Sequence, residues 1–164
     1  MSNIGIRRAV LEDIPDIQAL YVQEEAAHRR LYPDYFHEQP TLLPEEILRE
    51  ELQDDDCLYL VATAGRQVVG FIFAKRERFS EQPHFRKVEY ALIEDCVVLE
   101  AHRRQGIATE LVEGVRRWAE ARGLKRVQLQ VWAGNEAASR LYRKLGFAEL
   151  IIRMESATDQ EGAP

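Results

Sequence analysis

The sequence is poor in cysteine, and it contains no long hydrophobic run. Its two cysteines, Cys57 and Cys96, both lie in apolar, strand-like runs. We therefore expect them to pack as small hydrophobic side chains rather than form a disulfide or a metal site. The four histidines have no metal-ligand spacing, so no metal is expected. No apolar run is long enough to span a membrane and no signal peptide opens the chain, which favours a cytoplasmic location.

Positive charge is also in short supply. Lys and Arg number 22 against 28 Asp and Glu, which gives a net charge of -6 and disfavours nucleic-acid binding. An acidic surface suits a cationic acceptor, although most acidic proteins are simply soluble. With 164 residues, 46% of them hydrophobic, the chain is long enough for one globular domain. We expect that domain over 1–155 and a frayed polar tail over 156–164.

The usual nucleotide motifs are missing as well. There is no P-loop lysine followed by Ser or Thr, and no dinucleotide fingerprint of three glycines. Instead, the apolar run 96–99 is followed by a short basic loop, 103–108, and then by an amphipathic helix. The first N–H groups of a helix have no partner within it, Gly106 allows a ligand to approach closely, and Arg103 and Arg104 can bond to phosphate. The pattern predicts an anion site, and the alternative is a solvated loop that caps a core helix.

Hydrophobic periodicity predicts a mixed α+β chain with the order β-α-α-β-β-β-α-β-α-β. The expected strands are 4–9, 57–62, 68–74, 86–99, 126–132 and 147–154. The expected helices are 13–30, 44–52, 107–119 and 135–146. Asp13 and Asn135 are the expected N-caps of the first and last helix, and Gly123 and Gly146 are the expected stops of the last two helices. The charged segment 76–83 is expected to be an excursion between two strands.

Two motifs resemble the GCN5-related N-acetyltransferase (GNAT) superfamily. Arg103-x-x-Gly106-x-Ala108 resembles its pyrophosphate loop, Arg/Gln-x-x-Gly-x-Gly/Ala, with alanine where glycine is commonest. The segment 135–147, NEAASRLYRKLGF, resembles its C-terminal signature, Asn-x-x-Ala/Ser-x-x-x-Tyr-x-x-x-Gly-Phe. The resemblance covers about 4–154 and is specific from residue 89 onward. It implies an acetyltransferase (GNAT) fold, in which a central, mostly antiparallel sheet is splayed between strands 4 and 5 and flanked by helices.

The resemblance also implies where acetyl-CoA, the cosubstrate, is held. The backbone of Cys96, Val97 and Val98 is expected to pair with the pantetheine arm like an extra strand, and one of these N–H groups is expected to polarise the thioester oxygen. The basic loop is expected to hold the pyrophosphate, and the start of the last helix is expected to contact the pantetheine. The loop residues are Arg103, Arg104, Gln105, Gly106, Ile107, Ala108 and Thr109, and the helix residues are Asn135, Glu136, Ala137 and Ala138.

Acetyl transfer to an amine needs a base, because alkylamines are protonated near neutral pH. Glu94 and Asp95 precede the apolar run, and the alternation of a strand would send them to opposite faces. The pattern Glu94-Asp95-x-x-Val98 resembles polyamine acetyltransferases, and on that resemblance Glu94 is the expected base and also contacts the acceptor. Asp95 or a water relay is the alternative. Tyr142 matches the superfamily tyrosine that is proposed as general acid, and its alternative role is that of a core aromatic.

The acceptor is expected to bind near an aromatic stretch in the N-terminal half. Tyr32, Tyr35 and Phe36 either form a wall of that site or simply cover the core. The expected function is direct acetyl transfer to a primary amine in a ternary complex. The alternative is a non-catalytic acyl-CoA-binding regulatory module, and a nucleotide-binding regulator is a third reading. The expected partner is a small-molecule or protein amine, with no nucleic acid or membrane, and a homodimer is left open.

Overall fold

The computed structural model describes residues 4–38, 43–79, 83–156 and 158. The chain divides into two compact units, Met1–Trp132 and Ala133–Pro164. Most of the tail expected over 156–164 lies outside the described residues. In the part of the chain that the structure covers, no helix has the length and apolar character needed to cross a bilayer.

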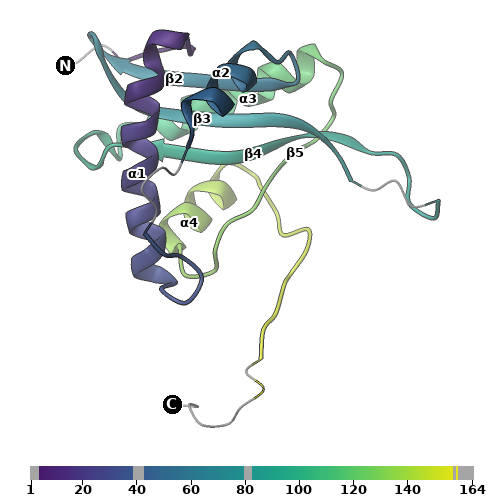
Figure 1. The fold of residues 1–164 in the computed structure, drawn as a ribbon. Helices are drawn as coiled ribbons and strands as arrows, with labels where there is room; N and C mark the ends of the chain where they lie inside the picture. Colours follow the sequence, from purple (N-terminus) through teal and green to yellow (C-terminus); the bar gives the residue numbers. More distant parts are fainter. Residues whose placement is uncertain (1–3, 39–42, 80–82, 157, 159–164) are drawn as a thin grey trace. The chain divides into compact units, whose positions relative to one another are not determined.

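The first unit is built on a five-stranded sheet (Figure 1). Its strands are β1 (Ile4–Arg8), β2 (Cys57–Ala64), β3 (Gln67–Arg78), β4 (Glu89–Val98) and β5 (Val127–Leu129), and they lie in this order across the sheet. β1 to β4 are antiparallel neighbours, whereas β5 runs parallel to β4 and pairs with it only along Ala91, Leu92 and Ile93. The sheet is therefore mostly antiparallel and opens between its fourth and fifth strands, which confirms the predicted fold class.

Helices cover both faces of this sheet (Figure 1). α1 (Ile14–Leu31) and α2 (Glu45–Gln53) pack on one face, and α3 (Ile107–Ala121) packs on the other. The short 3-10 turns η1 (Leu11–Asp13) and η2 (Glu100–His102) precede α1 and α3. The core under α1 and α2 contains buried residues of both helices and of β2, β3 and β4: Ile14, Ile17, Leu20, Leu48, Tyr59, Val61, Phe71, Phe73 and Val97. The stripe of α3 that faces the sheet is Ile107, Leu111, Val112, Val115 and Trp118, as the periodicity predicts.

The start of α1 differs from the prediction that Asp13 caps it with its side chain. Asp13 does occupy the N-cap position, but its carboxylate makes no cap hydrogen bond to the helix. Instead it accepts hydrogen bonds from the Arg7 guanidinium at 2.6 and 2.8 Å and from the Val10 N–H at 2.8 Å. These charge-assisted bonds lower the pKa of Asp13, first through the hydrogen bond from Arg7. The carboxylate thus ties β1 to the turn before α1.

The segment expected to be an excursion, 76–83, begins as regular strand. β3 continues to Arg78, and its last residues pair with the start of β4, with Arg78 opposite Glu89. Glu89 accepts hydrogen bonds from Arg76 at 2.8 Å and from Arg78 at 3.2 Å. The prediction was wrong here because charged residues stay in a ladder when they are exposed and paired across it. Residues 80–82 lie outside the described residues.

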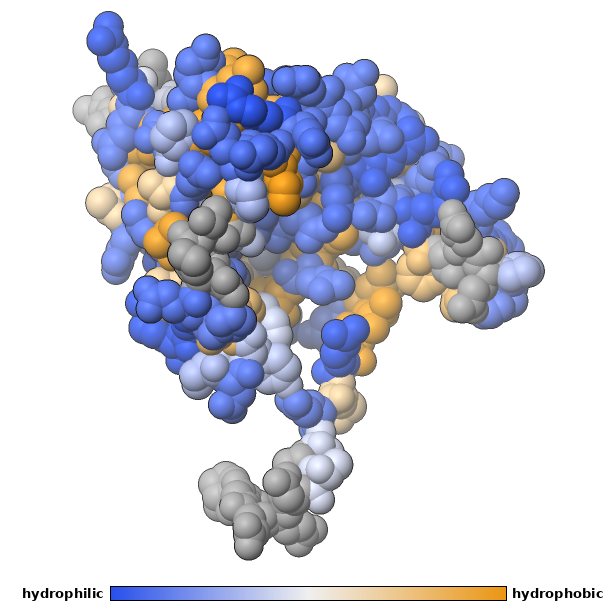
Figure 2. All heavy atoms as spheres, in the orientation of Figure 1, coloured by the Kyte–Doolittle hydropathy of each residue, from blue (hydrophilic) through white to orange (hydrophobic). Residues whose placement is uncertain are grey.

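The second unit contains α4 (Glu136–Lys144), which confirms the last predicted helix. The Asn135 side chain accepts a hydrogen bond from the Ala138 N–H at 3.2 Å, and Gly146 ends the helix region with φ 86. The strand predicted over 147–154 is absent, and its residues form no pairing. Its apolar side chains, including Leu150 and Ile151, are exposed and appear as an orange stretch before the tail in Figure 2. An apolar segment forms a strand only where it can pair with another strand. β5 is also shorter than predicted, with three residues in the strand.

Candidate active site at the open edge of strand β4

A β-bulge in β4 decides where the two acidic residues of the predicted site point. Along β3, Phe73 pairs with Asp95 and the next residue, Ala74, pairs with Ile93, so Glu94 is an extra residue without a partner on β3. Because paired residues share a face, Asp95 faces α1 and α2 together with Phe73. The prediction that Glu94 and Asp95 point to opposite faces is wrong, since the bulge interrupts the alternation on which it rested.

Glu94 forms an ion pair on that same side of the sheet. Its Oε1 lies 2.7 Å from the Nζ of Lys75, a β3 residue two positions beyond Phe73. Both side chains are only about one third exposed, at 36% and 35%. The hydrogen bond that Lys75 donates to Glu94 is the main cause that raises the pKa of Lys75. The expected base therefore already has a cationic partner in the folded chain.

Asp95 faces a second carboxylate, that of Glu24, on α1. The Oε2 atom of Glu24 is buried and has no hydrogen-bond partner among the described residues. Burial, followed by the charges of Asp95 and Glu25, raises the pKa of Glu24 to about 8. Burial, followed by Glu94, Glu51 and Glu25, raises the pKa of Asp95 to about 7, while Lys75 acts in the opposite direction. Two half-buried acids with few cations nearby thus have pKa values near neutral pH, which is the range a general base needs.

The second half of α1 lines this acidic site with one of its faces. Tyr21, Glu24, Glu25 and His28 recur at helical spacing, and Tyr32 follows one turn later at the end of the helix. Burial, together with the charges of Asp95 and Glu25, raises the pKa of the Tyr21 phenol, so it stays neutral. The pKa of His28 is lowered, mainly by burial. The sequence reasoning missed Glu24 and Glu25, and their signal was an acid on the helix stripe that also carries the buried Ile17 and Leu20.

The aromatic stretch after α1 gathers around one tryptophan. The ring of Trp132 lies 4.6 Å from that of Tyr32, 5.4 Å from that of Tyr35 and 5.3 Å from that of Phe36. Tyr35 is 53% exposed and Trp132 37% exposed, so the aromatic cluster presents ring surface to solvent. Trp132 was not predicted as a site residue, because it lies about 100 residues away in the sequence and only the fold brings it here.

The edge of β4 beyond the bulge is open toward β5. β5 pairs only as far as Ile93, so within the sheet the segment 94–98 has a strand partner on one side alone. On that partner side Cys96 pairs with Ile72, Val97 with Phe71 and Val98 with Gly70. A strand edge that has no neighbouring strand can bind an extended ligand through main-chain hydrogen bonds.

The basic loop at the end of this edge has an unusual backbone. Arg104 has φ 63 and Gly106 has φ 84, so two left-handed residues lie within three positions. A run of N–H groups in such a conformation forms an anion-binding concavity, and it leads here into the start of α3, which has no side-chain cap. A Cβ built on Gly106 would meet nothing within 4 Å, so the space above the loop is open. Arg103, Arg104 and Gln105 are exposed, and the Arg103 Nε donates to the Val98 carbonyl at 3.0 Å.

These features fit the phosphate end of acetyl-CoA. The unpaired N–H groups at the start of α3 and the flanking arginines match a pyrophosphate in charge and in hydrogen bonding. Ile107 is buried and anchors the helix, while Ala108 and Thr109 are half-buried in its first turn. Among the described residues no group of three or more His, Cys, Asp or Glu side chains could hold a metal ion.

The remaining predicted site residues lie in the second unit. The side-chain oxygen of Asn135 accepts the capping hydrogen bond of α4, and its amide N–H groups can donate to other partners. Glu136 pairs with Arg140 at 3.0 Å, Ala137 is exposed and Ala138 is half-buried. Tyr142 is half-buried, and its ring lies 5.6 Å from that of Phe147 in an edge-to-face contact. Tyr142 is therefore packed through its ring and only partly exposed.

Residues 19–147 match the model of the acetyltransferase (GNAT) family. The chain belongs to this family. Its members take their acetyl group from acetyl-CoA. Over 163 residues, this acetyltransferase is 30% identical to an N-alpha-acetyltransferase of Sulfurisphaera tokodaii, in an alignment that spans 96% of the chain and 88% of that protein.

Solved structures show the same architecture. A mutant of the BH1408 protein of Bacillus halodurans superposes with a TM-score of 0.87 at 23% identity, over 93% of this acetyltransferase and 99% of that chain. The aminoglycoside N-acetyltransferase AAC(6')-Iy, solved in complex with CoA, superposes with a TM-score of 0.72 at 20% identity over 96% of both chains. At these identities the likeness establishes the fold.

Proposed function

We propose that this acetyltransferase transfers the acetyl group of acetyl-CoA directly to a primary amine, with both substrates bound together in a ternary complex. The observation that carries the proposal is the bulge at Glu94. It puts a carboxylate with a raised pKa, Asp95, next to the open edge of β4 that leads to the phosphate loop. The names of two similar proteins support an amine acceptor, since one is an N-alpha-acetyltransferase and the other is an aminoglycoside N-acetyltransferase.

Acetyl-CoA would lie along the open edge of β4. Cys96, Val97 and Val98 would hydrogen-bond the pantetheine, and one of their N–H groups would stabilise the negative charge that develops on the thioester oxygen. Asn135 and the first turn of α4, Glu136 to Ala138, would contact the same arm. Arg103 to Thr109 would hold the pyrophosphate through the start of α3.

Asp95 would be the base, in preference to Glu94. The acceptor arrives as an ammonium, and the Asp95 carboxylate takes one proton from it, directly or through a water molecule. The amine nitrogen then bonds to the thioester carbon, and the carbon–sulfur bond breaks. Glu94, held by Lys75, keeps the entrance negative and attracts the cation. As the amide forms, the nitrogen loses its second proton, and this proton replaces the one that Tyr142 gives to the departing sulfur. The products are the acetylated amine and the free thiol, and Asp95 returns its proton to solvent.

Tyr142 would supply the proton for the departing sulfur. A phenol donates a hydrogen bond without ionising, which suits a thiolate leaving group. Tyr142→Phe keeps the ring contact with Phe147, so we expect unchanged affinity for acetyl-CoA and a kcat lower by about 10²–10⁴-fold. Stopped-flow kinetics under conditions where the chemical step is rate-limiting would measure this. An unchanged kcat there would make Tyr142 a packing residue.

The acceptor would lie between the acidic face of α1 and the aromatic cluster. Its ammonium would approach Glu24, Glu94 and Asp95, and its body would contact Tyr32, Tyr35, Phe36 and Trp132 through stacking or cation–π contacts. A primary amine attached to an apolar or planar group fits this arrangement of charge and ring surface.

The test is a panel of primary amines, including peptides with a free N-terminus, aminoglycosides and small diamines, assayed by thiol release and by mass spectrometry of the product. Gly106→Glu is the matched negative control, because φ 84 disfavours a side chain there and the new carboxylate repels pyrophosphate. We expect thiol release with some amines in the wild type and none in the variant. Tight acetyl-CoA binding without thiol release for any amine would instead favour the non-catalytic acyl-CoA-binding module.

A further inference from the structure

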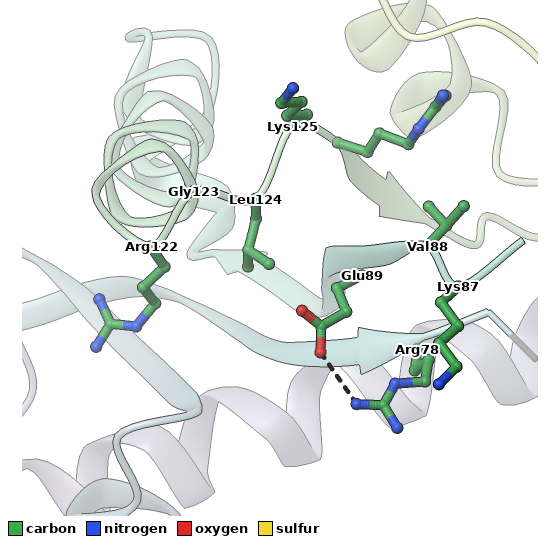
Figure 3. Close-up of a pocket in the computed structure, with 9 residues that line it drawn as sticks. Arg78, Lys87, Val88, Glu89, Arg122, Gly123, Leu124 and Lys125 are labelled. Atoms are coloured by element: carbon green, nitrogen blue, oxygen red, sulfur yellow. Dashed lines mark hydrogen bonds and ion pairs between the residues drawn. The ribbon is translucent and has the colours of Figure 1, made fainter. Parts of the chain in front are cut away.

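A second hollow lies in the first unit, near the start of β4 and beyond the end of α3 (Figure 3). Its volume is about 480 Å³, and it is formed by the last residue of β3, by the residues around the start of β4 and by the loop between α3 and β5. Five of its nine lining side chains are cationic and one is acidic, although the whole chain carries a net charge of -6. The cations are Arg78, Lys87, Arg122, Lys125 and Arg126.

The one acidic residue does not neutralise this group. Glu89 is already bonded to Arg76 at 2.8 Å and to Arg78 at 3.2 Å, and these bonds lower the pKa of its carboxyl. Figure 3 shows the Arg78 guanidinium bonded to Glu89 across the hollow. Glu89 therefore holds two arginines in place and leaves the positive charge of the other lining residues uncompensated.

Three of the cations have no partner for their side chains among the described residues. They are Lys87, Lys125 and Arg126, and all three are exposed. Arg122 is anchored instead, since its guanidinium donates to the Asp55 carbonyl at 3.0 and 3.2 Å. Like charges that line one hollow repel one another, and a multivalent anion would relieve that repulsion.

The floor of the hollow is apolar. Leu124 is 7% exposed and points toward Glu89 in Figure 3, and Val88 is half-buried at the rim. A cationic rim over an apolar floor fits a ligand with a multivalent anionic end and an apolar ring. The volume lies in the range of small-molecule sites, which is roughly 300–1,000 Å³.

The hollow is separate from the acetyl-CoA loop. The loop precedes α3, and the hollow begins one residue after that helix ends, at Arg122. The 15 residues of α3 span about 22 Å at about 1.5 Å per residue. The two sites also lie at opposite ends of β4, since the hollow contains Glu89 and the loop follows Val98. A ligand at one site does not touch the other.

We propose that this hollow is a binding site for a nucleoside polyphosphate, with the phosphates on the lysines and arginines of the rim and the ring against Leu124. Phosphate suits this donor set because guanidinium groups bind it in a bidentate way and ammonium groups bind it as point charges. The site goes beyond acetyl transfer and does not depend on the identity of the acceptor.

Trp118 provides a reporter close to the site. The Arg122 guanidinium carbon lies 4.6 Å from the centre of the Trp118 ring, so a phosphate that draws on Arg122 changes the environment of that indole. The chain has only two tryptophans, and Trp132→Phe leaves Trp118 alone. A nucleoside triphosphate without divalent metal, titrated into this variant, should give a saturable change in Trp118 fluorescence, with calorimetry on the wild type as a second readout.

Variants of the rim locate the signal. Lys125→Gln with Arg126→Gln should weaken the triphosphate by about tenfold or more, because both charge-assisted partners are lost. The matched control is Arg66→Gln with Lys144→Gln, which removes the same charge from exposed positions elsewhere. The control should change the affinity by less than about twofold, and the KM for acetyl-CoA should be unchanged in both double variants. Gly106→Glu should also keep the titration, because it alters only the acetyl-CoA loop.

Several results would overturn the proposal. They are an absence of saturation, equal losses in the two double variants, or loss of the signal in Gly106→Glu, which would place the binding at the acetyl-CoA loop. A tricarboxylate of similar charge that binds as tightly would show that only negative charge is recognised. Inorganic tripolyphosphate that binds as tightly as the nucleoside triphosphate would remove the role of Leu124.

Discussion

The two ends of β4 carry opposite charges in different physical states. At the Asp95 end, the side chains of Glu24 and Asp95 are half-buried with few cations nearby, and their pKa values are raised toward neutrality. At the Glu89 end, the charges are exposed or paired, and the pairing lowers the pKa of Glu89. A buried and poorly paired charge changes its proton affinity, whereas a solvated charge keeps it and acts through its field. The first state suits proton transfer, and the second suits binding.

The largest effect that would sharpen this comparison is expected from Asp95→Asn. The amide cannot accept the ammonium proton, so kcat/KM for the amine should fall by about 10²–10⁴-fold, and the rise of activity as pH passes about 7 should disappear. Steady-state rates from pH 6 to 9 measure both. Glu94→Gln should cost less than about tenfold, and Glu89→Gln at the other end of β4 should leave the rate unchanged. A larger loss in Glu94→Gln than in Asp95→Asn would return the role of base to Glu94.

A smaller effect is expected on stability from Glu24→Gln. Because the folded-state pKa of Glu24 lies above its ordinary value, the folded form binds the proton more tightly than the unfolded one. Its stabilising contribution is complete below the ordinary pKa and is lost as pH rises through about 8. Glutamine imitates the protonated acid at every pH, so the variant should match the wild type near pH 4. Near pH 9 it should be more stable by about 1–3 kcal/mol.

Urea unfolding at several pH values would measure this difference. Glu110→Gln on the exposed side of α3 is the control, and it should shift neither curve. A difference in the free energy of unfolding between Glu24→Gln and the wild type that is the same at all pH values would show that the folded structure does not raise the pKa of Glu24.

The smallest effect concerns salt. Exposed cations are screened by added ions, and buried carboxylates are screened much less. Raising the salt concentration from 0.05 to 0.5 M should therefore weaken triphosphate binding at the basic hollow by roughly tenfold or more, and should raise the KM for the amine by less than roughly threefold. Calorimetry and initial rates give the two slopes. Equal salt dependence at both ends would mean that the acids near Asp95 are as solvated as the lysines near Glu89.

Much of the fold could be predicted because it depends on local patterns. The stripe of α3 and the cap at Asn135 follow from side-chain spacing and from one hydrogen bond. The direction of Glu94 could not be predicted in this way, because a single extra residue in β4 reverses the alternation and nothing in the sequence marks it. The prediction of a strand over 147–154 was wrong for a related reason, since strand formation depends on a partner strand elsewhere in the chain.

The candidate site shows the same division. The loop around Gly106 was identified from its motif, and the structure adds that Arg104 also adopts a left-handed conformation. Glu24 and Trp132 were missed because their roles depend on tertiary neighbours, the face of β4 in one case and the loop after α1 in the other. A helix stripe that places an acid beside Ile17 and Leu20 was the one available sign of Glu24.

The open edge of β4 has a consequence for the behaviour of the protein at high concentration. A strand edge without a neighbouring strand is a template for the strand of another molecule, and the segment 94–98, which β5 does not reach, contains no proline. A ligand that hydrogen-bonds this edge would cover it, so CoA should act as a guard against self-association as well as a substrate. Turbidity on gentle heating should rise later with CoA present than without it, and Gly106→Glu should lose that protection.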